Sequence, residues 1–138
     1  MIKTDYIELS TKGHTDIKDI TPALKEKVQS SGIASGTVTL FVPGSTGGLT
    51  TIEYEPGLLK DIPEALEIIA PENADYEHHK TWHDDNGSSH VRAALIGPSL
   101  TVPFVEGELT LGTWQQVVFI DFDTRSRNRR IVVQIMGE

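Results

Sequence analysis

The sequence predicts an α+β fold, a single domain of mixed, mainly antiparallel β-sheets with a few short helices. The chain has 138 residues, the size of one domain with one core. About seven segments have the pattern of strands, and they do not alternate with helices in the regular order of a parallel sheet. No linker divides the chain, so we expect one domain over residues 1–138.

The first part of the chain predicts a strand, a turn and a helix. Residues 2–10 place apolar side chains among polar neighbours, which indicates a strand, and residues 11–16 have the composition of a turn. Thr21 can cap a helix that starts at Pro22, because proline fits the first helical position without losing a needed donor. Gly32 favours the end of this helix, which we predict over Pro22–Ser31.

The next part predicts two strands and a helical segment. Residues 36–43 alternate threonine with apolar residues, and their β-branched content is typical of a strand. A glycine-rich turn over residues 43–48 leads into a second strand over residues 49–54. Apolar residues then recur with helical spacing between residues 58 and 69, where Pro63 predicts a break.

Residues 71–89 lack apolar periodicity and predict a long polar loop. Loops of this length in compact domains are usually functional or disordered, and the histidine and aromatic content here favours a functional loop. Ser89 can cap a short helix over residues 90–96, which Gly97 ends.

The C-terminal part predicts four further strands. Residues 99–105 and 108–111 have the pattern of a hairpin, with Pro103 at a sheet edge or a bulge because proline cannot donate to a sheet. Residues 116–122 and 130–136 are the last two predicted strands.

Composition excludes several classes of protein. The chain has no cysteine, so disulfides, thiolate metal sites and cysteine nucleophiles are excluded. The net charge of −8 should repel nucleic acid, which is therefore not an expected partner. No apolar run approaches the ~20 residues that cross a bilayer, so we expect no membrane association and a cytoplasmic location.

The segment Tyr76–His90 holds four of the five histidines and two adjacent carboxylates. Imidazole and carboxylate groups bind divalent ions, so we predict a site for zinc or magnesium. The predicted ligands are His78, His83 and His90, with Asp85 as a further ligand or as the acceptor that orients an imidazole. The alternative is that these histidines are solvated side chains of a surface loop.

Two features could bind a small phosphorylated molecule. Arg92 lies in the first turn of the predicted helix over residues 90–96, whose N–H groups favour an anion. The alternative for Arg92 is a surface arginine paired with a nearby acid. Ser45 and Thr46 add hydroxyl and N–H groups in the glycine-rich turn, and Glu53 on the following strand could complete a binding site.

Six runs of the sequence together resemble one known family. They are Phe41–Thr46, Thr51–Gly57, Tyr76–His90, Leu95–Pro103, Leu111–Gln116 and Val132–Glu138. The runs are similar to the YjbQ-type family, which is associated with secondary thiamine-phosphate synthase activity, and the similarity covers nearly the whole chain.

The resemblance implies an α+β fold that assembles as a homotrimer with clefts near subunit boundaries. It also implies an enzyme that joins a pyrimidine pyrophosphate to a thiazole phosphate, giving thiamine phosphate and pyrophosphate. His78, Asp85 and His90 match polar positions of the family's histidine-rich motif. Thr113 and Gln115 match its Gly-Thr-Trp-Gln motif, and we expect both to contact the substrate.

The chain departs from the family pattern at Gly44, where many relatives carry a histidine, so His83 would have to supply that ligand. For the synthase we expect a metal, Arg92 and helix N–H groups to stabilise the departing pyrophosphate. Two alternatives use the same residues. One is metal-assisted hydrolysis of a small phosphorylated compound, with Asp85 or His83 as general base. The other is a non-catalytic protein that binds a metal or an anion between subunits.

Overall fold

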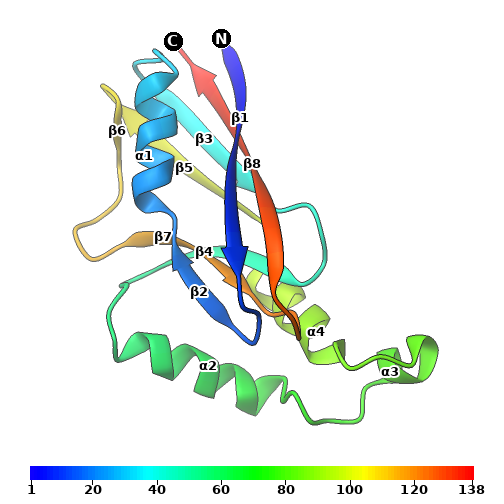
Figure 1. Ribbon diagram of the computed structural model, residues 1–138. Coiled ribbons are helices and arrows are strands. Elements are labelled where there is room, and N and C mark those ends of the chain that lie inside the picture. Colours follow the sequence, from blue (N-terminus) through cyan, green and yellow to red (C-terminus); the bar gives the residue numbers. More distant parts are fainter.

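The computed structural model describes all residues from 1 to 138 and contains eight strands and four helices (Figure 1). In chain order the elements are β1 (Ile2–Thr11), β2 (Asp16–Asp19), α1 (Thr21–Ser30), β3 (Gly36–Phe41), β4 (Gly47–Ile52), α2 (Leu58–Ile69), α3 (Glu77–Trp82), α4 (Gly87–Ile96), β5 (Ser99–Val105), β6 (Glu108–Leu109), β7 (Gln116–Asp121) and β8 (Arg127–Gly137). None of the helices has the length and apolar character needed to cross a bilayer.

The strands form two antiparallel sheets. One sheet has five strands in the order β1-β8-β3-β5-β6, and the other has three in the order β2-β7-β4. Every strand pair in both sheets is antiparallel. The predicted α+β class with mainly antiparallel sheets is therefore confirmed, and the turn between β3 and β4 carries the chain from one sheet to the other.

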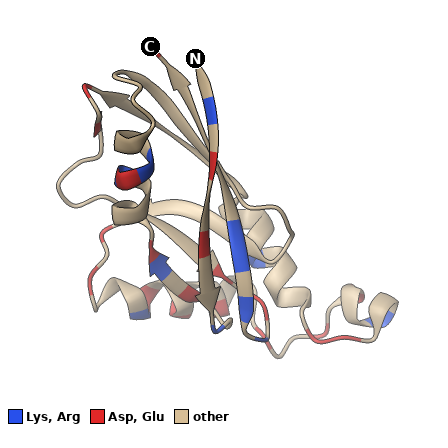
Figure 2. Ribbon diagram, turned by 45° about the horizontal axis from the view of Figure 1, so that its top comes forward, with Lys and Arg blue, Asp and Glu red and all other residues tan.

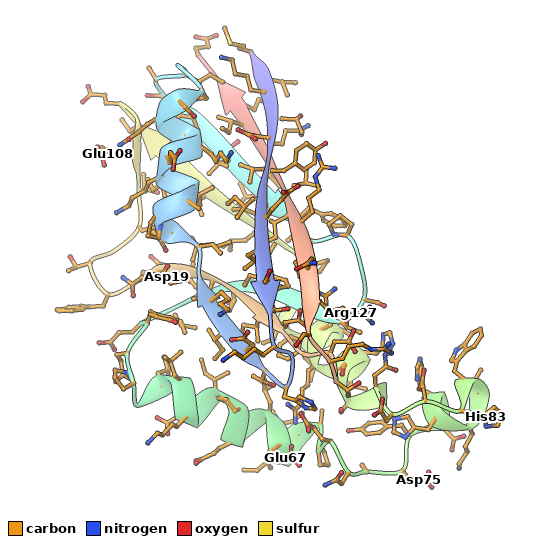
Figure 3. The ribbon with its side chains drawn as sticks, viewed as in Figure 1. Asp19, Glu67, Asp75, His83, Glu108 and Arg127 are labelled. Atoms are coloured by element: carbon orange, nitrogen blue, oxygen red, sulfur yellow. The ribbon has the colours of Figure 1, made fainter.

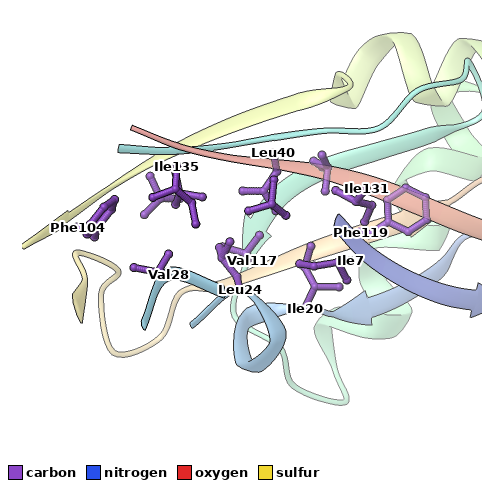
Figure 4. Close-up of a cluster of buried hydrophobic side chains, with 14 of the residues drawn as sticks. Ile7, Ile20, Leu24, Val28, Leu40, Phe104, Val117, Phe119, Ile131 and Ile135 are labelled. Carbon is purple, nitrogen blue, oxygen red and sulfur yellow. The ribbon is translucent and has the colours of Figure 1, made fainter. Parts of the chain in front are cut away.

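The three-stranded sheet lies between two apolar clusters because its central strand, β7, is buried on both faces. Val117 and Phe119 belong to the larger cluster, formed with α1 and the inward face of the five-stranded sheet (Figure 4). Val118 and Ile120 point the other way, into a smaller cluster with residues of α2 and α4. Such a strand has a continuous apolar run instead of alternation.

The start of α1 differs from the predicted cap. Thr21 is the first helical residue, and its hydroxyl donates to the carbonyl of Val117 at 3.3 Å and accepts from the N–H of the same residue at 2.8 Å. The carboxylate of Asp19 instead accepts the N–H of Thr21 at 2.9 Å. Thr21 therefore fastens α1 to β7, whereas Gly32 follows the helix with a φ of 73°, as the predicted helix end requires.

Three further features of the structure differ from the prediction. Pro63 lies inside α2 without breaking it, since Leu66 and the partly buried Leu59 hold the helix against the smaller core. No strand was predicted where β2 lies, and the predicted turn over residues 11–16 shares only Asp16 with it. The segment predicted as a long loop contains α3 and the first turn of α4, which starts at Gly87 rather than His90.

Candidate functional site

A pocket of about 380 Å³ lies between the β3–β4 turn and α4. Gly44, Ser45 and Gly47 line one side, and His90, Ala93 and Pro98 line the other. A larger hollow, about 510 Å³, lies against the paired strands β1 and β8, and none of the predicted site residues lines it. The pocket at the turn therefore joins two sequence motifs that are far apart in the chain.

The turn presents unused hydrogen-bond donors. The backbone N–H groups of Gly44, Ser45 and Thr46 have no acceptor within the chain, and the hydroxyl of Ser45 makes no hydrogen bond. Gly44 has a φ of 129°, a conformation that side chains rarely allow, so glycine permits this turn. Successive free N–H groups form a site suited to an anion.

Two imidazoles lie together, and one of them, that of His90, lines the pocket. The ring centroids of His78, on α3, and His90, on α4, are 4.4 Å apart. Nδ1 of His78 is 3.0 Å from Oδ1 of Asp84, and the carboxylate can only accept, so Nδ1 carries the hydrogen of this bond. Asp84 thus fixes the tautomer of His78, and His90 presents an imidazole to the pocket.

His79 is half-buried and has a structural position. Its Nε2 accepts the N–H of Gly87 at 2.9 Å, and its ring meets Tyr76 edge to face at 5.3 Å. A Cβ on Gly87 would come within 2.6 Å of Tyr76, so glycine is needed at the start of α4. These contacts fasten the start of α4 to the start of α3.

The structure does not bring the three predicted metal ligands together. His83 follows α3 in the left-handed conformation and lies at the outer end of that helix, away from the body of the protein (Figure 3). Asp85 accepts a hydrogen bond from Thr124 at 3.1 Å. No group of three or more histidine, aspartate or glutamate side chains is arranged to hold a metal ion within the chain.

Arg92 is not placed to bind a phosphate. It lies in the second turn of α4 with only 3% of its side chain exposed. Nε donates to the carbonyl of Ala70 at 3.0 Å, Nη1 to the hydroxyl of Thr15 at 2.7 Å, and Nη2 to the carboxylate of Glu67 at 2.7 Å. Each guanidinium nitrogen is engaged, so this arginine connects α4 to α2 and to the turn after β1.

A buried network of charges adjoins the β3–β4 turn, and sequence analysis missed it. Arg129 donates to both oxygens of Asp121, from Nε at 2.7 Å and from Nη2 at 2.8 Å, and Nη2 also donates to the Thr46 hydroxyl at 2.8 Å. Arg127 donates to Asp123 at 2.7 Å. Figure 2 shows basic residues on the part of β8 that belongs to this network. A signal for this network was present in the sequence. Asp121 and Asp123 are two residues apart, as are Arg127 and Arg129, and the two pairs flank the connection between β7 and β8.

The network keeps its members charged. Burial alone would raise the pKa of Asp121, but hydrogen bonds from Arg129, Thr11 and the N–H of Asp123 outweigh it and hold the pKa below the usual 3.8. The pKa of Asp123 is lowered in the same way, against burial, chiefly by the N–H of Thr124 and by Arg127. The hydrogen bond to Asp121 raises the pKa of Arg129 above its ordinary value, so the guanidinium stays charged.

The remaining predicted substrate residues lie at the opposite end of β4. Glu53 and Thr113 line a hollow of about 330 Å³ beside the exposed Trp114, and Gln115 donates to the Thr51 hydroxyl at 3.1 Å. The six residues of β4 separate this hollow from the pocket that Ser45 lines, about 20 Å at the rise of a strand. Within one chain, the predicted substrate residues therefore lie in two separate regions, the pocket at the β3–β4 turn and the region around Trp114.

Comparisons with known proteins agree on one family. The family model described as "UPF0047 protein YjbQ-like" matches residues 5–138. A UPF0047 protein of Methanothermobacter thermautotrophicus is 39% identical over 137 residues, covering 99% of this chain and 94% of that protein. The UPF0047 protein YugU of Bacillus subtilis is 31% identical over 139 residues, covering 99% of this chain and all of that protein.

Solved structures agree with the sequence comparisons. The crystal structure of a YbjQ-like protein of unknown function from Sulfolobus solfataricus has a TM-score of 0.94 and 32% identity, covering 100% of this chain and 99% of that chain. A hypothetical protein from Aeropyrum pernix K1 has a TM-score of 0.91 and 29% identity, covering 99% of both chains. The match over residues 5–138, together with these relatives, shows that the chain belongs to the YjbQ-like UPF0047 family.

Proposed function

We propose that the pocket between the β3–β4 turn and α4 binds a small phosphorylated molecule, and that the chain acts on it as a transferase of the thiamine-phosphate synthase type. One observation carries the proposal. Three unused backbone N–H groups, at Gly44, Ser45 and Thr46, lie on a turn that lines the same pocket as the imidazole of His90. Anion donors beside an acid–base group suit a reaction in which a phosphorylated leaving group departs.

The specific reaction comes from the sequence resemblance, and its chemistry fits these groups. The bond between the methylene carbon of the pyrimidine and a pyrophosphate oxygen breaks, and pyrophosphate leaves with the electron pair. The ring nitrogen of the thiazole phosphate then forms the new carbon–nitrogen bond. The turn N–H groups stabilise the charge that develops on pyrophosphate, an effect that can reach several kcal/mol.

His90 supplies the acid of this step. Its imidazolium form donates a proton to an oxygen of the departing pyrophosphate, and the adjacent ring of His78, oriented by Asp84, fixes the geometry of the imidazole pair. No covalent nucleophile is needed, in keeping with the absence of cysteine.

A divalent metal remains a prediction from the sequence. The set His78, His83 and His90 does not fit one ion within a single chain, since His83 lies at the outer end of α3. The proposal needs only the donors of the turn and the imidazole pair.

Direct product analysis tests the proposal. The purified protein is given the pyrimidine pyrophosphate and the thiazole phosphate, and thiamine phosphate is measured by chromatography with mass detection. We expect product from the parent protein and about a 100-fold slower reaction from His90→Asn, the scale of general acid catalysis. His83→Asn, which changes an exposed histidine outside the pocket, is the matched control and should keep the parent rate.

Two results would contradict the synthase. Phosphate release without a carbon–nitrogen product would identify a hydrolase using the same pocket. Equal rates for the parent and His90→Asn would remove His90 from the chemistry.

A further inference from the structure

We infer that Arg129 is the cation of the phosphate subsite, and that it holds a terminal phosphoryl group against the β3–β4 turn. The inference rests on the proposed function, because it names the residue that recognises the phosphorylated end of the ligand. The sequence pattern assigned this role to Arg92, but each of the three guanidinium nitrogens of Arg92 already donates a hydrogen bond elsewhere in the chain.

One guanidinium nitrogen of Arg129 has no hydrogen-bond partner in the chain. A guanidinium has five N–H groups. Nε uses one for Asp121, and Nη2 uses its two for Asp121 and the hydroxyl of Thr46. Nη1 makes no hydrogen bond within the chain, although only 11% of the side chain is exposed. Two donors of a largely buried cation are therefore unused.

The unused nitrogen lies beside Gly44, which lines the pocket, while Arg129 itself also lines the larger hollow along β1 and β8. A Cβ built on Gly44 would lie 3.6 Å from Nη1 of Arg129, and no other atom outside the neighbouring residues would lie within 4 Å of it. Because Gly44 has no side chain, a phosphoryl oxygen can approach Nη1 along this direction. The same group would meet the free N–H groups of Gly44 and Ser45 and the hydroxyl of Ser45.

The network also fixes the guanidinium before a ligand binds. Asp121 holds Arg129 through two parallel hydrogen bonds, which restrict the plane and direction of the guanidinium. Asp121, Asp123, Arg127 and Arg129 together carry no net charge, so the site does not rely on a broad positive field. Recognition would depend on the direction of Nη1 and the turn N–H groups, which favours a compact tetrahedral anion such as a phosphate monoester or the terminal group of pyrophosphate.

Matched charge-neutral double variants separate Arg129 from the rest of the network. Arg129→Gln with Asp121→Asn removes the proposed cation together with its buried partner, so no lone charge stays buried. Arg127→Gln with Asp123→Asn makes the same change in the neighbouring pair, where Arg127 is 40% exposed. Binding of pyrophosphate and of inorganic phosphate is measured by isothermal titration calorimetry at constant ionic strength.

We expect the Arg129 double variant to bind pyrophosphate about 10- to 100-fold more weakly, the scale of one charge-assisted hydrogen bond. The Arg127 double variant should stay within about threefold of the parent, because Arg127 makes no hydrogen bond to the β3–β4 turn and Asp123 reaches it only through a long bond of 3.4 Å from the Thr46 hydroxyl. If the parent protein binds pyrophosphate more tightly than phosphate, the ligand of the subsite is the pyrophosphate leaving group. If it binds phosphate more tightly, the ligand is a phosphate monoester. Equal losses in both double variants, or no loss in the Arg129 variant, would overturn the inference.

A measurement on the parent protein keeps the inference testable if the Arg129 variant does not fold. In a nitrogen-15 spectrum, titration with pyrophosphate should shift the Nε signal of Arg129 and the amide signals of Gly44 and Ser45. The Nε signal of Arg92 is the internal control and should not move. Shifts at Arg92 alone would overturn the inference. A protein that binds pyrophosphate through Arg129 but forms no thiamine phosphate would overturn the proposed reaction and leave the inference standing.

Discussion

Asp121 shows how one side chain can serve both the stability of the fold and the site. It is fully buried, yet it stays charged because Arg129, Thr11 and a backbone N–H all donate to it. Its two bonds to Arg129 also direct the free nitrogen of that arginine toward Gly44. A charge buried without such partners would cost several kcal/mol.

The lowered pKa values of Asp121 and Asp123 predict a loss of stability in acid. In the folded chain the pKa of each carboxyl is lower than the ordinary value of 3.8. Their stabilising effect is therefore fully present above that value and is lost as the pH falls through it toward the lower folded values. Urea unfolding between pH 6 and about pH 3 should show this loss, and the double variant Arg129→Gln with Asp121→Asn should show less of it. An identical acid dependence in parent and variant would show that Asp121 does not contribute.

At this scale the sequence predicted some roles and not others. His90, from the histidine-rich segment, and Ser45, from the glycine-rich turn, line the same pocket. A single anion site formed by both segments requires this arrangement. The roles of Arg92 and Arg129 could not be assigned, because an arginine in sequence does not reveal which carboxylate it will meet. Arg92 lies on the buried side of α4 and Arg129 on the inward face of β8, and only the packing of those elements decides which has a free nitrogen.

Among the elements, α4 holds the site in place. Its start is fastened by His79, and its second turn is fastened to α2 by Arg92. His90 lies between these two attachments, so its position depends on both.

We predict that Arg92→Leu destabilises the protein without affecting ligand recognition. Removing the guanidinium leaves the carbonyl of Ala70 and the hydroxyl of Thr15 without their donor, which should lower the free energy of unfolding by about 2–3 kcal/mol. Urea unfolding measures this, with the exposed Arg125→Leu as control. Pyrophosphate affinity at a temperature where the variant is folded should equal that of the parent. A stable variant with weakened pyrophosphate binding would return Arg92 to the site.

Most strands could be predicted because their residue patterns are local. The helices were harder, since α3 and the start of α4 are held by side-chain contacts that no periodic pattern indicates, such as the bond from the N–H of Gly87 to His79. Pro63 did not break α2 because packing on the smaller core outweighs the missing hydrogen bond. The short β2 depends on pairing with β7, which its own four residues do not indicate.

For the whole molecule, the five-stranded sheet has one face without a covering helix. α1 packs against the inward face (Figure 1), whereas the outward face exposes apolar side chains in register across the strands. Tyr6 and Phe41 flank Val132, and Ile2 faces Met136. Phe41 is 45% and Met136 49% exposed.

This face supports the homotrimer implied by the family resemblance, which stays a prediction. Light scattering at micromolar concentration should give three times the mass of one chain. The variant Phe41→Glu should dissociate the assembly, because it places a charge among apolar neighbours, while Trp82→Glu, an exposed aromatic residue on α3, should not. A monomeric parent protein, or a trimer unaffected by Phe41→Glu, would contradict this use of the sheet.

The most direct measurement of where the ligand binds is a crystal structure of the protein grown with pyrophosphate. We predict a phosphoryl group beside the β3–β4 turn, within hydrogen-bond distance of the N–H groups of Gly44 and Ser45 and of Nη1 of Arg129, with His90 facing the ligand across the pocket. Pyrophosphate bound instead in the hollow of Glu53 and Trp114, or along β1 and β8, would contradict the proposed site.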